Sequence, residues 1–278
     1  RYSSDELEEG RQALLDLGVF ASIDIEQDTA AFAETRVVPI TVKTQPAKIR
    51  ALLLGAGVEL DSLKADAHAQ VGWQSANFLG GLRRLDVRYK PGLVLYPTRF
   101  PDLRAPTELL YEHRLNATLR QPAFVEKRTT GFTRAEYSVY PVLLPTPTEN
   151  VLGYHELRGE VGLERSFFRR LFVSPVYDLQ SNFPIDYVGR VLNVETLFIS
   201  YVGLTTHLDY RDDPVRPRRG VWVGNELQLA GGLLQGDAND IRTRPEIRAF
   251  IPLPRRFTVA LRGSVGLLFP FNYSKFSR

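Results

Sequence analysis

The sequence predicts an all-β membrane protein, an antiparallel transmembrane β-barrel that follows a short α+β segment. Segments of about ten residues that alternate apolar and polar side chains fill most of the chain after residue 46. Aromatic residues stand near the ends of many of these segments, where barrels place their aromatic girdles. A stretch with helical periodicity occurs only before residue 46.

The composition limits the classes of protein that the chain can belong to. Its 278 residues are 44% apolar, which suits a folded chain and not a disordered one. A net charge of +3 with 24% charged residues gives no electrostatic argument for binding nucleic acid. The absence of cysteine excludes disulfides and thiolate metal sites. No apolar run approaches the roughly 20 residues of a spanning helix, so the chain either is soluble or enters a membrane as strands.

The first part of the chain predicts one helix and two strands. Residues 3–18 start with a capping-box pattern and end at Gly18, which is a typical helix C-cap. The alternating segments 19–27 and 36–45 predict strands joined by an alanine-rich connection. A helix and a hairpin of this size bury little apolar surface, so we expect them to be part of a larger domain.

The rest of the chain predicts about ten strands. Along residues 66–74, for example, Val71 and Trp73 share a face opposite Gln70 and Gln74. The expected strands are residues 50–60, 66–74, 82–90, 112–121, 132–140, 155–164, 194–209, 220–230, 245–251 and 257–269. Connections of unequal length, long at 93–111 and 166–191 and short at 252–256, predict long loops on one rim and short turns on the other.

Alternation by itself fits a soluble β-sandwich about as well as a barrel. The composition of the polar face favours the barrel. A sandwich normally exposes Lys and Glu on short strands, whereas here Arg, Glu, Asp, Gln, Gly and Ser follow one another along longer strands. We therefore expect the polar side chains to line a wet lumen.

Three stretches resemble one family. Residues 209–220, "DYRDDPVRPRRG", resemble a turn motif of the bacterial surface antigen family, the BamA and TamA barrel-assembly proteins of the outer membrane. Residues 14–27, "LLDLGVFASIDIEQ", are similar to the second helix and following strand of a POTRA repeat. Residues 75–89, "SANFLGGLRRLDVRY", are similar to the passage between barrel strands two and three. The resemblance favours TamA-like members.

The resemblance implies an organisation and a function. Residues 1–46 would be a partial POTRA domain, and residues 47–278 a barrel that lacks the C-terminal strands of the family's sixteen. The protein would insert or export clients through a barrel with a lateral seam at its first strand. Its partners would be nascent outer-membrane or secreted polypeptides, the lipid bilayer, and a periplasm-spanning or lipoprotein partner, with no nucleic acid and no cofactor. It would lie in the bacterial outer membrane with its N-terminal segment in the periplasm.

The candidate site residues fall into three groups. The edge of the first barrel strand, where a client strand would pair, comprises Leu52, Leu54, Gly55, Gly57 and Val58. The turn between strands two and three comprises Asn77, Gly80 and Gly81. The family turn motif comprises Asp209, Arg211, Asp212, Pro214, Pro217 and Gly220. The two glycines of the edge either loosen the strand or relieve crowding in a curved sheet.

Other functions receive less support from the sequence. A metal site at Asp209, Asp212 and Asp213 is disfavoured because four arginines stand in the same segment. The four histidines lie on different expected strands, and no nucleophile elbow or carboxylate pair indicates an enzyme. A dedicated two-partner secretion pore, a passive porin-like channel and a soluble β-sandwich binding module remain as alternatives.

Overall fold

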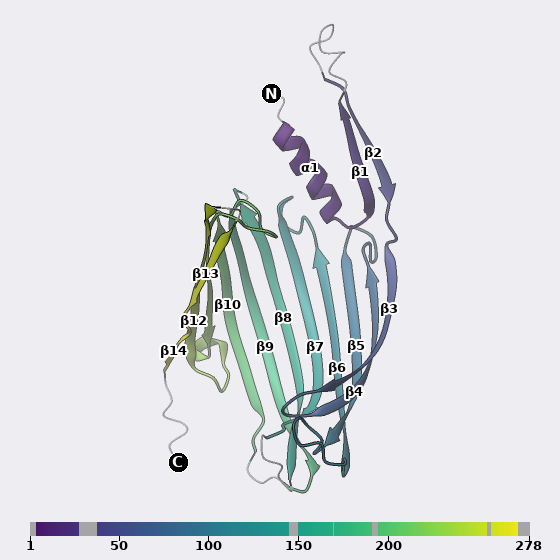
Figure 1. Ribbon diagram of the computed structural model, residues 1–278, viewed down its shortest axis with the longest axis vertical. Coiled ribbons are helices and arrows are strands. Elements are labelled where there is room, and N and C mark those ends of the chain that lie inside the picture. The colour runs from purple at the N-terminus through teal and green to yellow at the C-terminus, as the bar shows by residue number, and fades with distance from the viewer. Residues whose placement is uncertain are drawn as a thin grey trace.

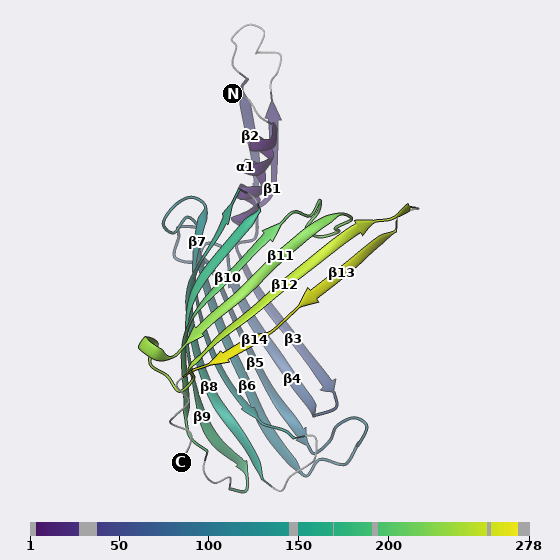
Figure 2. The same ribbon diagram turned by 90° about the vertical axis from the view of Figure 1, so that its left-hand side faces the viewer.

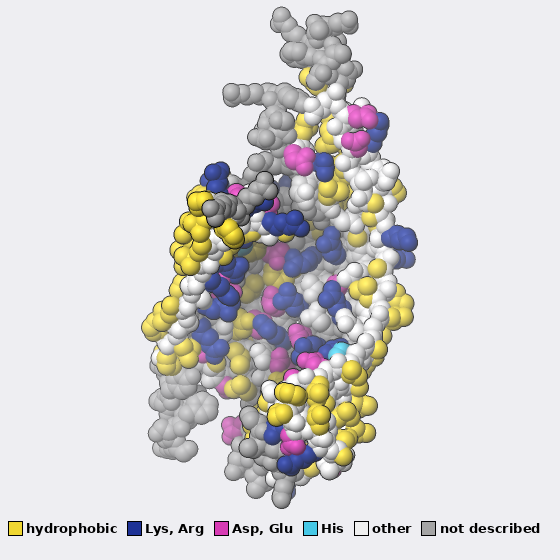
Figure 3. Space-filling view, viewed as in Figure 1, with side chains coloured by type: hydrophobic (Ala, Val, Ile, Leu, Met, Phe, Trp, Pro, Cys, Tyr) yellow, Lys and Arg dark blue, Asp and Glu magenta, His cyan; other side chains and the backbone are white. Residues whose placement is uncertain are grey.

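A computed structural model describes residues 4–27, 38–144, 150–168, 170–190, 194–254 and 257–271. These residues form one helix, a two-stranded sheet and a strongly curled 12-stranded antiparallel sheet (Figure 1), whose concave side encloses a hollow (Figure 3). None of the helices in these ranges is long and apolar enough to cross a membrane. The described strands form an open, curled sheet, which is the fold of an incomplete antiparallel transmembrane β-barrel, as the alternating segments predict.

The predicted helix and hairpin are present at the start of the chain. Helix α1 (Ser4–Asp16) is followed by β1 (Phe20–Gln27) and β2 (Ile40–Pro46), which pair antiparallel. The helix ends as expected, because Gly18 has a φ of 68° and its N–H donates to the Leu15 carbonyl at 2.9 Å. The predicted capping residue Ser3 and the connection at 28–37 lie outside the described residues.

The large sheet is a meander in which each strand pairs with its neighbours in the chain, except that the last two strands both pair with the strand before them. Its first six strands are β3 (Arg50–Leu60), β4 (Ala65–Ser75), β5 (Arg84–Tyr96), β6 (Glu108–Gln121), β7 (Thr129–Pro141) and β8 (Val151–Phe167). The others are β9 (Leu171–Val188), β10 (Leu197–Asp209), β11 (Gly220–Ala230), β12 (Asp240–Pro252), β13 (Thr258–Ser264) and β14 (Leu267–Pro270), with a short 3-10 helix, Gly232–Leu234, before β12. The strands β3 to β12 have 11 to 18 residues, enough to cross a bilayer when tilted.

One expected loop is in fact a strand. Residues 166–191 contain β9, an 18-residue strand that pairs along both of its edges. Pro175 and Pro184 favoured a loop in the sequence, because proline cannot donate to a ladder. The alternation is nevertheless present, since Ser174 and Asp178 face the hollow while Leu179 faces outward. The connection expected at 93–111 is also shorter, because β5 and β6 extend into it from both sides.

The strand expected at 257–269 is divided. Both β13 and β14 pair with β12 in one continuous register, and the division falls at Val265 and Gly266. Val265 lies opposite Pro245 and donates its N–H to the Pro245 carbonyl at 3.1 Å. Pro245 has no N–H to return, so the ladder is interrupted at that point.

The two faces of the large sheet have opposite character. The concave side gathers Lys, Arg, Asp and Glu side chains, whereas apolar side chains stand along the outer edges (Figure 3). On the convex side Leu54 and Val58 are 73% and 85% exposed, and many other large apolar residues are exposed like them. A β-sandwich would bury such residues against a second sheet. The arrangement instead suits an outer surface in lipid and a wet inner wall.

The connections leave the sheet at two rims. The α1 rim, next to the N-terminal helix and hairpin, carries the connections 76–83, 122–128 and 210–219 (Figure 1). The opposite or far rim carries the connections 61–64, 97–107 and 231–239. The expected division into long loops and short turns is therefore wrong for 210–219, which is as long as most far-rim connections.

A pair of glycines on β8 allows a test of the faces. A Cβ at Gly162 would lie 2.6 Å from Phe132 Cζ and 2.8 Å from Val176 Cγ1, whereas a Cβ at Gly159 would meet nothing within 4 Å. We expect Gly162→Ala to lower the free energy of unfolding by about 1–3 kcal/mol through overpacking, and Gly159→Ala to change it little. Urea unfolding in detergent micelles, followed by heat-modifiable gel mobility, would measure both; equal effects would contradict the assigned faces.

Candidate functional site

Strand β3 is an edge of the large sheet. It pairs with β4 along one side, and the described sheet has no strand along its other side, so β3 forms one edge and β13 and β14 together form the other (Figure 2). Leu52, Leu54 and Val58 lie on its convex face and are 65%, 73% and 85% exposed. Their neighbours Gly55 and Gly57 face the concave side, because successive side chains alternate. This strand presents free backbone groups and apolar side chains together.

The structure separates the roles of the two glycines. A Cβ at Gly57 would lie 2.9 Å from His68 Nε2, so Gly57 leaves room for the imidazole of the paired residue. At Gly55 the nearest atom is Gln70 Cβ at 3.9 Å, which is an ordinary contact. Crowding therefore explains Gly57 and does not explain Gly55. Gly55 leaves the edge backbone uncovered by any side chain and makes it less costly to deform.

A charged cluster fixes the far-rim end of β3 and β4. The Lys64 ammonium lies 2.7 Å from Glu112 Oε2 and 3.1 Å from Asp66 Oδ2, and His68 Nδ1 lies 2.7 Å from Asp66 Oδ1. Glu59, Asp66 and His68 bring ligand-type atoms within 4.8 Å of one another, a grouping that spacing along one strand did not reveal. Lys64 already supplies a positive charge to Asp66, so the geometry does not call for a metal ion.

The turn at 76–83 lies between β4 and β5, the second and third strands of the large sheet, as predicted. Asn77 Oδ1 accepts the Leu82 N–H at 3.0 Å and so closes the loop. Gly80 and Gly81 have φ angles of 77° and 67°, which glycine adopts without steric cost. The turn adjoins the start of β3, since the Ala76 N–H donates to the Ile49 carbonyl at 2.7 Å.

The family turn motif joins β10 to β11 on the α1 rim. The Asp209 carboxylate accepts two bonds from the Arg211 guanidinium, from Nε to Oδ1 at 2.9 Å and from Nη2 to Oδ2 at 2.6 Å. Arg211 Nη1 also donates to the Pro214 carbonyl at 3.2 Å. Gly220 has a φ of 114°, and a Cβ there would lie 2.3 Å from the Tyr210 carbonyl oxygen. These motif residues are therefore bonded to one another or shaped by the turn, with Pro217 half-buried among them.

The two central acids of the turn act as caps for backbone N–H groups. Asp212 Oδ1 accepts from the N–H groups of Arg218 and Arg219 at 3.0 and 3.2 Å. Asp213 Oδ1 accepts from those of Val215 and Arg216 at 2.7 and 3.0 Å. These bonds hold the pKa of both carboxyl groups below its ordinary value, because they stabilise the ionised form. The same oxygens are thereby occupied, which argues against a metal site here.

The concave wall carries ion pairs between strands, and all but Arg120–Glu164 join neighbouring strands. Arg158 Nε donates to Asp178 Oδ2 at 2.7 Å, and its Nη2 donates to the Tyr201 hydroxyl at 2.8 Å. Asp178 is fully buried, so this guanidinium is the charge that balances it. Further pairs are Arg120–Glu164, Arg134–Glu160, Arg244–Glu226 and Arg262–Glu246. The sequence indicated a polar face, but the pairs depend on a register that only the structure supplies.

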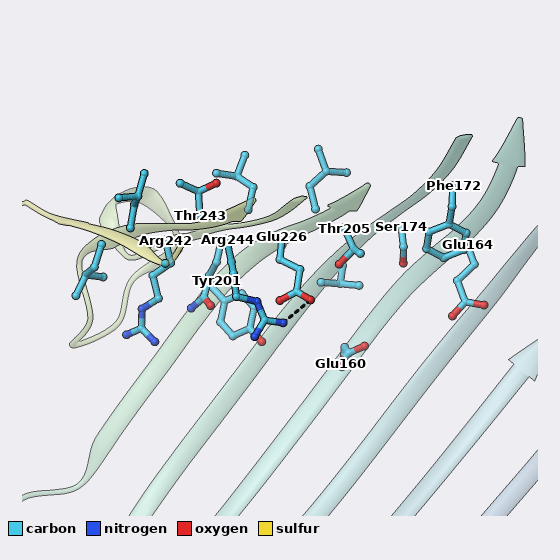
Figure 4. Close-up of a pocket in the computed structure, with 18 of the residues that line it drawn as sticks. Glu160, Glu164, Phe172, Ser174, Tyr201, Thr205, Glu226, Arg242, Thr243 and Arg244 are labelled. Atoms are coloured by element: carbon cyan, nitrogen blue, oxygen red, sulfur yellow. Dashed lines mark hydrogen bonds and ion pairs between the residues drawn. The ribbon is translucent and has the colours of Figure 1, made fainter. Parts of the chain in front are cut away.

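A hollow of about 830 Å³ lies against part of this wall. It is lined by residues of β7 to β12 and β14, among them Glu160, Glu164, Tyr201 and Arg242 (Figure 4). The figure shows the Arg244 guanidinium meeting the Glu226 carboxylate, which lie 2.8 Å apart. Charges of both signs alternate around the hollow. Such a wall can form hydrogen bonds with a polar polypeptide in the hollow, and it does not select for either positive or negative charge.

The structure brings only some of the candidate residues together. The β3 edge and the turn at 76–83 adjoin each other, whereas the turn at 210–219 stands at the other end of the sheet order on the same rim. The charged cluster around Asp66 and the paired wall were not predicted as sites. Each needs residues from two or more strands, and the periodicity of one strand does not reveal such groupings.

Comparison with known proteins supports the fold. Neither a described protein family nor a curated protein matches the sequence. Among solved structures, the chain is similar to a crystal structure of BamA from Haemophilus ducreyi lacking POTRA domains 1–3, with a TM-score of 0.59 and 13% sequence identity. The match covers 95% of this chain and 49% of that one, so the chain spans about half the length of the BamA structure. At this identity the likeness shows a BamA-like barrel fold.

The caps in the turn at 210–219 can be tested by proteolysis. Asp212→Ala removes the acceptor for two backbone N–H groups, whereas Asp212→Asn retains an oxygen there. We expect trypsin at neutral pH to cut after Arg218 or Arg219 several-fold faster in Asp212→Ala and near the wild-type rate in Asp212→Asn. Mass spectrometry of timed digests would measure the rates; indistinguishable rates in all three proteins would contradict the capping role.

The same capping makes the turn sensitive to acid. Because the folded pKa of Asp212 is depressed, its stabilising contribution is complete above the ordinary value of about 3.9 and is lost as pH falls through the lower folded pKa. We expect the carboxyl resonance of Asp212, followed by NMR in micelles, to titrate below that ordinary value. A midpoint at or above it would show that the bonds are not formed.

The wall pair of Arg158 and Asp178 can be tested by a double substitution. Arg158→Met leaves the buried Asp178 carboxylate without its counter-charge and should lower the free energy of unfolding by about 3 kcal/mol. Adding Asp178→Leu removes the unpaired charge, so the double variant should recover most of that loss. Urea unfolding in micelles would measure all three proteins, and additive losses would exclude the coupling.

Proposed function

We propose that the chain is part of an outer-membrane assembly or translocation factor, in which the edge of β3 pairs with a strand of a client polypeptide. The proposal is supported by the BamA-like barrel fold and, above all, by the exposed β3 edge with its apolar convex face. On this proposal the barrel lies in the bacterial outer membrane. The sequence resemblance favours a TamA-like member, and the fold is compatible with either kind.

The mechanism rests on edge pairing. A client strand that aligns with β3 would gain main-chain hydrogen bonds by β-augmentation. The bilayer increases this gain, because a backbone group left unpaired in hydrocarbon costs several kcal/mol. Leu52, Leu54 and Val58 would then continue the apolar surface onto the client strand. Gly55, which packs against nothing that requires glycine, would let the edge bend to admit it.

The segment before the barrel fits the same proposal. We assign residues 1–46 to a partial POTRA domain on the periplasmic side, which makes the α1 rim the periplasmic rim. Strand β2 has seven exposed residues and pairs with β1 along one side, so it offers a second edge to an extended polypeptide. Nascent outer-membrane or secreted polypeptides would be the clients, and a periplasm-spanning or lipoprotein partner would meet this segment.

Cysteine crosslinking tests the edge directly, because the chain has no cysteine of its own. Single cysteines introduced at each position from 50 to 60 of the full-length protein would be paired with one cysteine on the convex face of a stalled client strand. We expect crosslinks at 52, 54, 56 and 58 and few at 51, 53, 55 and 57, because side chains alternate between faces. Gel mobility of the adduct would give the yields.

Matched cysteines provide the control for this experiment. Positions 221 and 223 on the convex face of β11 are similarly apolar but lie inside the sheet, so they should give no adduct. Absence of crosslinks along β3 in protein that is folded in the membrane would contradict the proposed edge. That outcome would favour a dedicated secretion pore, in which the charged wall of the hollow would line the path of the secreted polypeptide.

A further inference from the structure

We propose that the convex side of the large sheet holds a specific glycerophospholipid near the α1 rim, with one acyl chain in an apolar groove and its anionic phosphate at Arg165, Lys127 and Arg128. The inference rests on the proposed membrane location and goes beyond it, because it assigns a binding site for one lipid class. It concerns a surface remote from the β3 edge.

The groove is formed by a row of neighbouring residues that crosses five strands. Leu119 pairs with Thr133, Thr133 with Val161, Val161 with Tyr177, and Tyr177 with Val202, so all five lie side by side on one face. The hollow at this row measures about 570 Å³, within the range of small-molecule sites. Its lining is almost entirely apolar, which suits a hydrocarbon chain.

The turn at 122–128 bounds the groove on the rim side. The Phe124 ring lies over Gly131, where a Cβ would be only 2.7 Å from Phe124 Cγ, so this glycine is needed for the ring to settle there. Phe124 and Val125 are nevertheless 59% and 75% exposed. Exposed apolar side chains in a rim turn are typical of residues that enter the interfacial layer of a membrane.

A positive charge, Arg165, lies at the rim end of the groove, where the lipid headgroup would lie. Arg165 follows Leu163 on the same face towards the rim, and its Nη1 lies 2.6 Å from Glu126 Oε1. Its guanidinium carbon is 4.3 Å from the centre of the Phe167 ring, and its buried Nε has no hydrogen-bond partner among the described residues. The buried Nε is not accessible to a ligand, but the guanidinium remains a fixed positive charge whose terminal nitrogens can donate to phosphate oxygens.

Two further cations make the rim an anion site. Lys127 and Arg128 are exposed, and the described part of the chain gives their side chains no acidic partner. With Arg165 they outnumber Glu126 by three charges to one, so the cluster is complementary to an anionic phosphate. The apolar groove and the cations lie in the order in which a phospholipid presents its acyl chain and headgroup.

Native mass spectrometry of the full-length protein from mixed micelles would test the site. The probes are phosphatidylglycerol and phosphatidylcholine with the same acyl chains, so that only the headgroup differs. We expect the protein to retain phosphatidylglycerol preferentially, and Lys127→Gln/Arg128→Gln to reduce that retention by about fivefold per charge removed. The matched control, Arg216→Gln/Arg218→Gln, removes two exposed charges from the same rim away from the groove and should leave retention unchanged.

A second pair of variants tests the groove itself. Val161→Trp should fill the groove and reduce retention of both lipids, whereas Val223→Trp on the convex face of β11 should not. Equal retention of both lipids by the wild type, or a copurifying peptide in place of lipid, would overturn the proposal. Recovery of the protein outside the membrane fraction would instead contradict the membrane location, so the two failures are distinguishable.

Discussion

The pairing of backbone hydrogen-bonding groups is the constraint on which this structure depends. In hydrocarbon an unpaired N–H or carbonyl costs several kcal/mol, because no water replaces the missing partner. Strands β4 to β12 satisfy this constraint along both of their edges, and β3, β13 and β14 satisfy it along one. The unpaired backbone groups of the described sheet are therefore at its edges, and a partner strand that pairs with them there gains the most free energy.

The register of the sheet follows from the same constraint and from the charges on the wall. A slip of one residue between two strands would turn every side chain to the other face. For β8 such a slip would carry Arg158 and Glu160 into lipid and Leu157 into the hollow. The pair of Arg158 with the buried Asp178 thus helps to fix the alignment, and it leaves few uncompensated charges on the wall.

Periodicity predicted the fold class and most strands, because each strand has one polar and one apolar face and its side chains alternate between them. It missed β9, because the prolines at 175 and 184 interrupt the alternating pattern. It also predicted β13 and β14 as one strand, because Pro245, which divides them, lies on another strand. The turn motif at 209–220 was predicted to lie between strands, but the capping by Asp212 was not. The difference between Gly55 and Gly57 could not be predicted, since it depends on His68 across the ladder.

The order of the strands also has a consequence for how the chain reaches this state. Apart from β14, which pairs with β12, each strand of the large sheet pairs with its neighbours in the chain, so the contacts are of low contact order and each closes only a short loop. The turn at 210–219 satisfies much of its hydrogen bonding within itself, which allows the β10–β11 hairpin to serve as a local nucleus. From such a nucleus the sheet can grow by one hairpin at a time in both directions, and the terminal strands then join last.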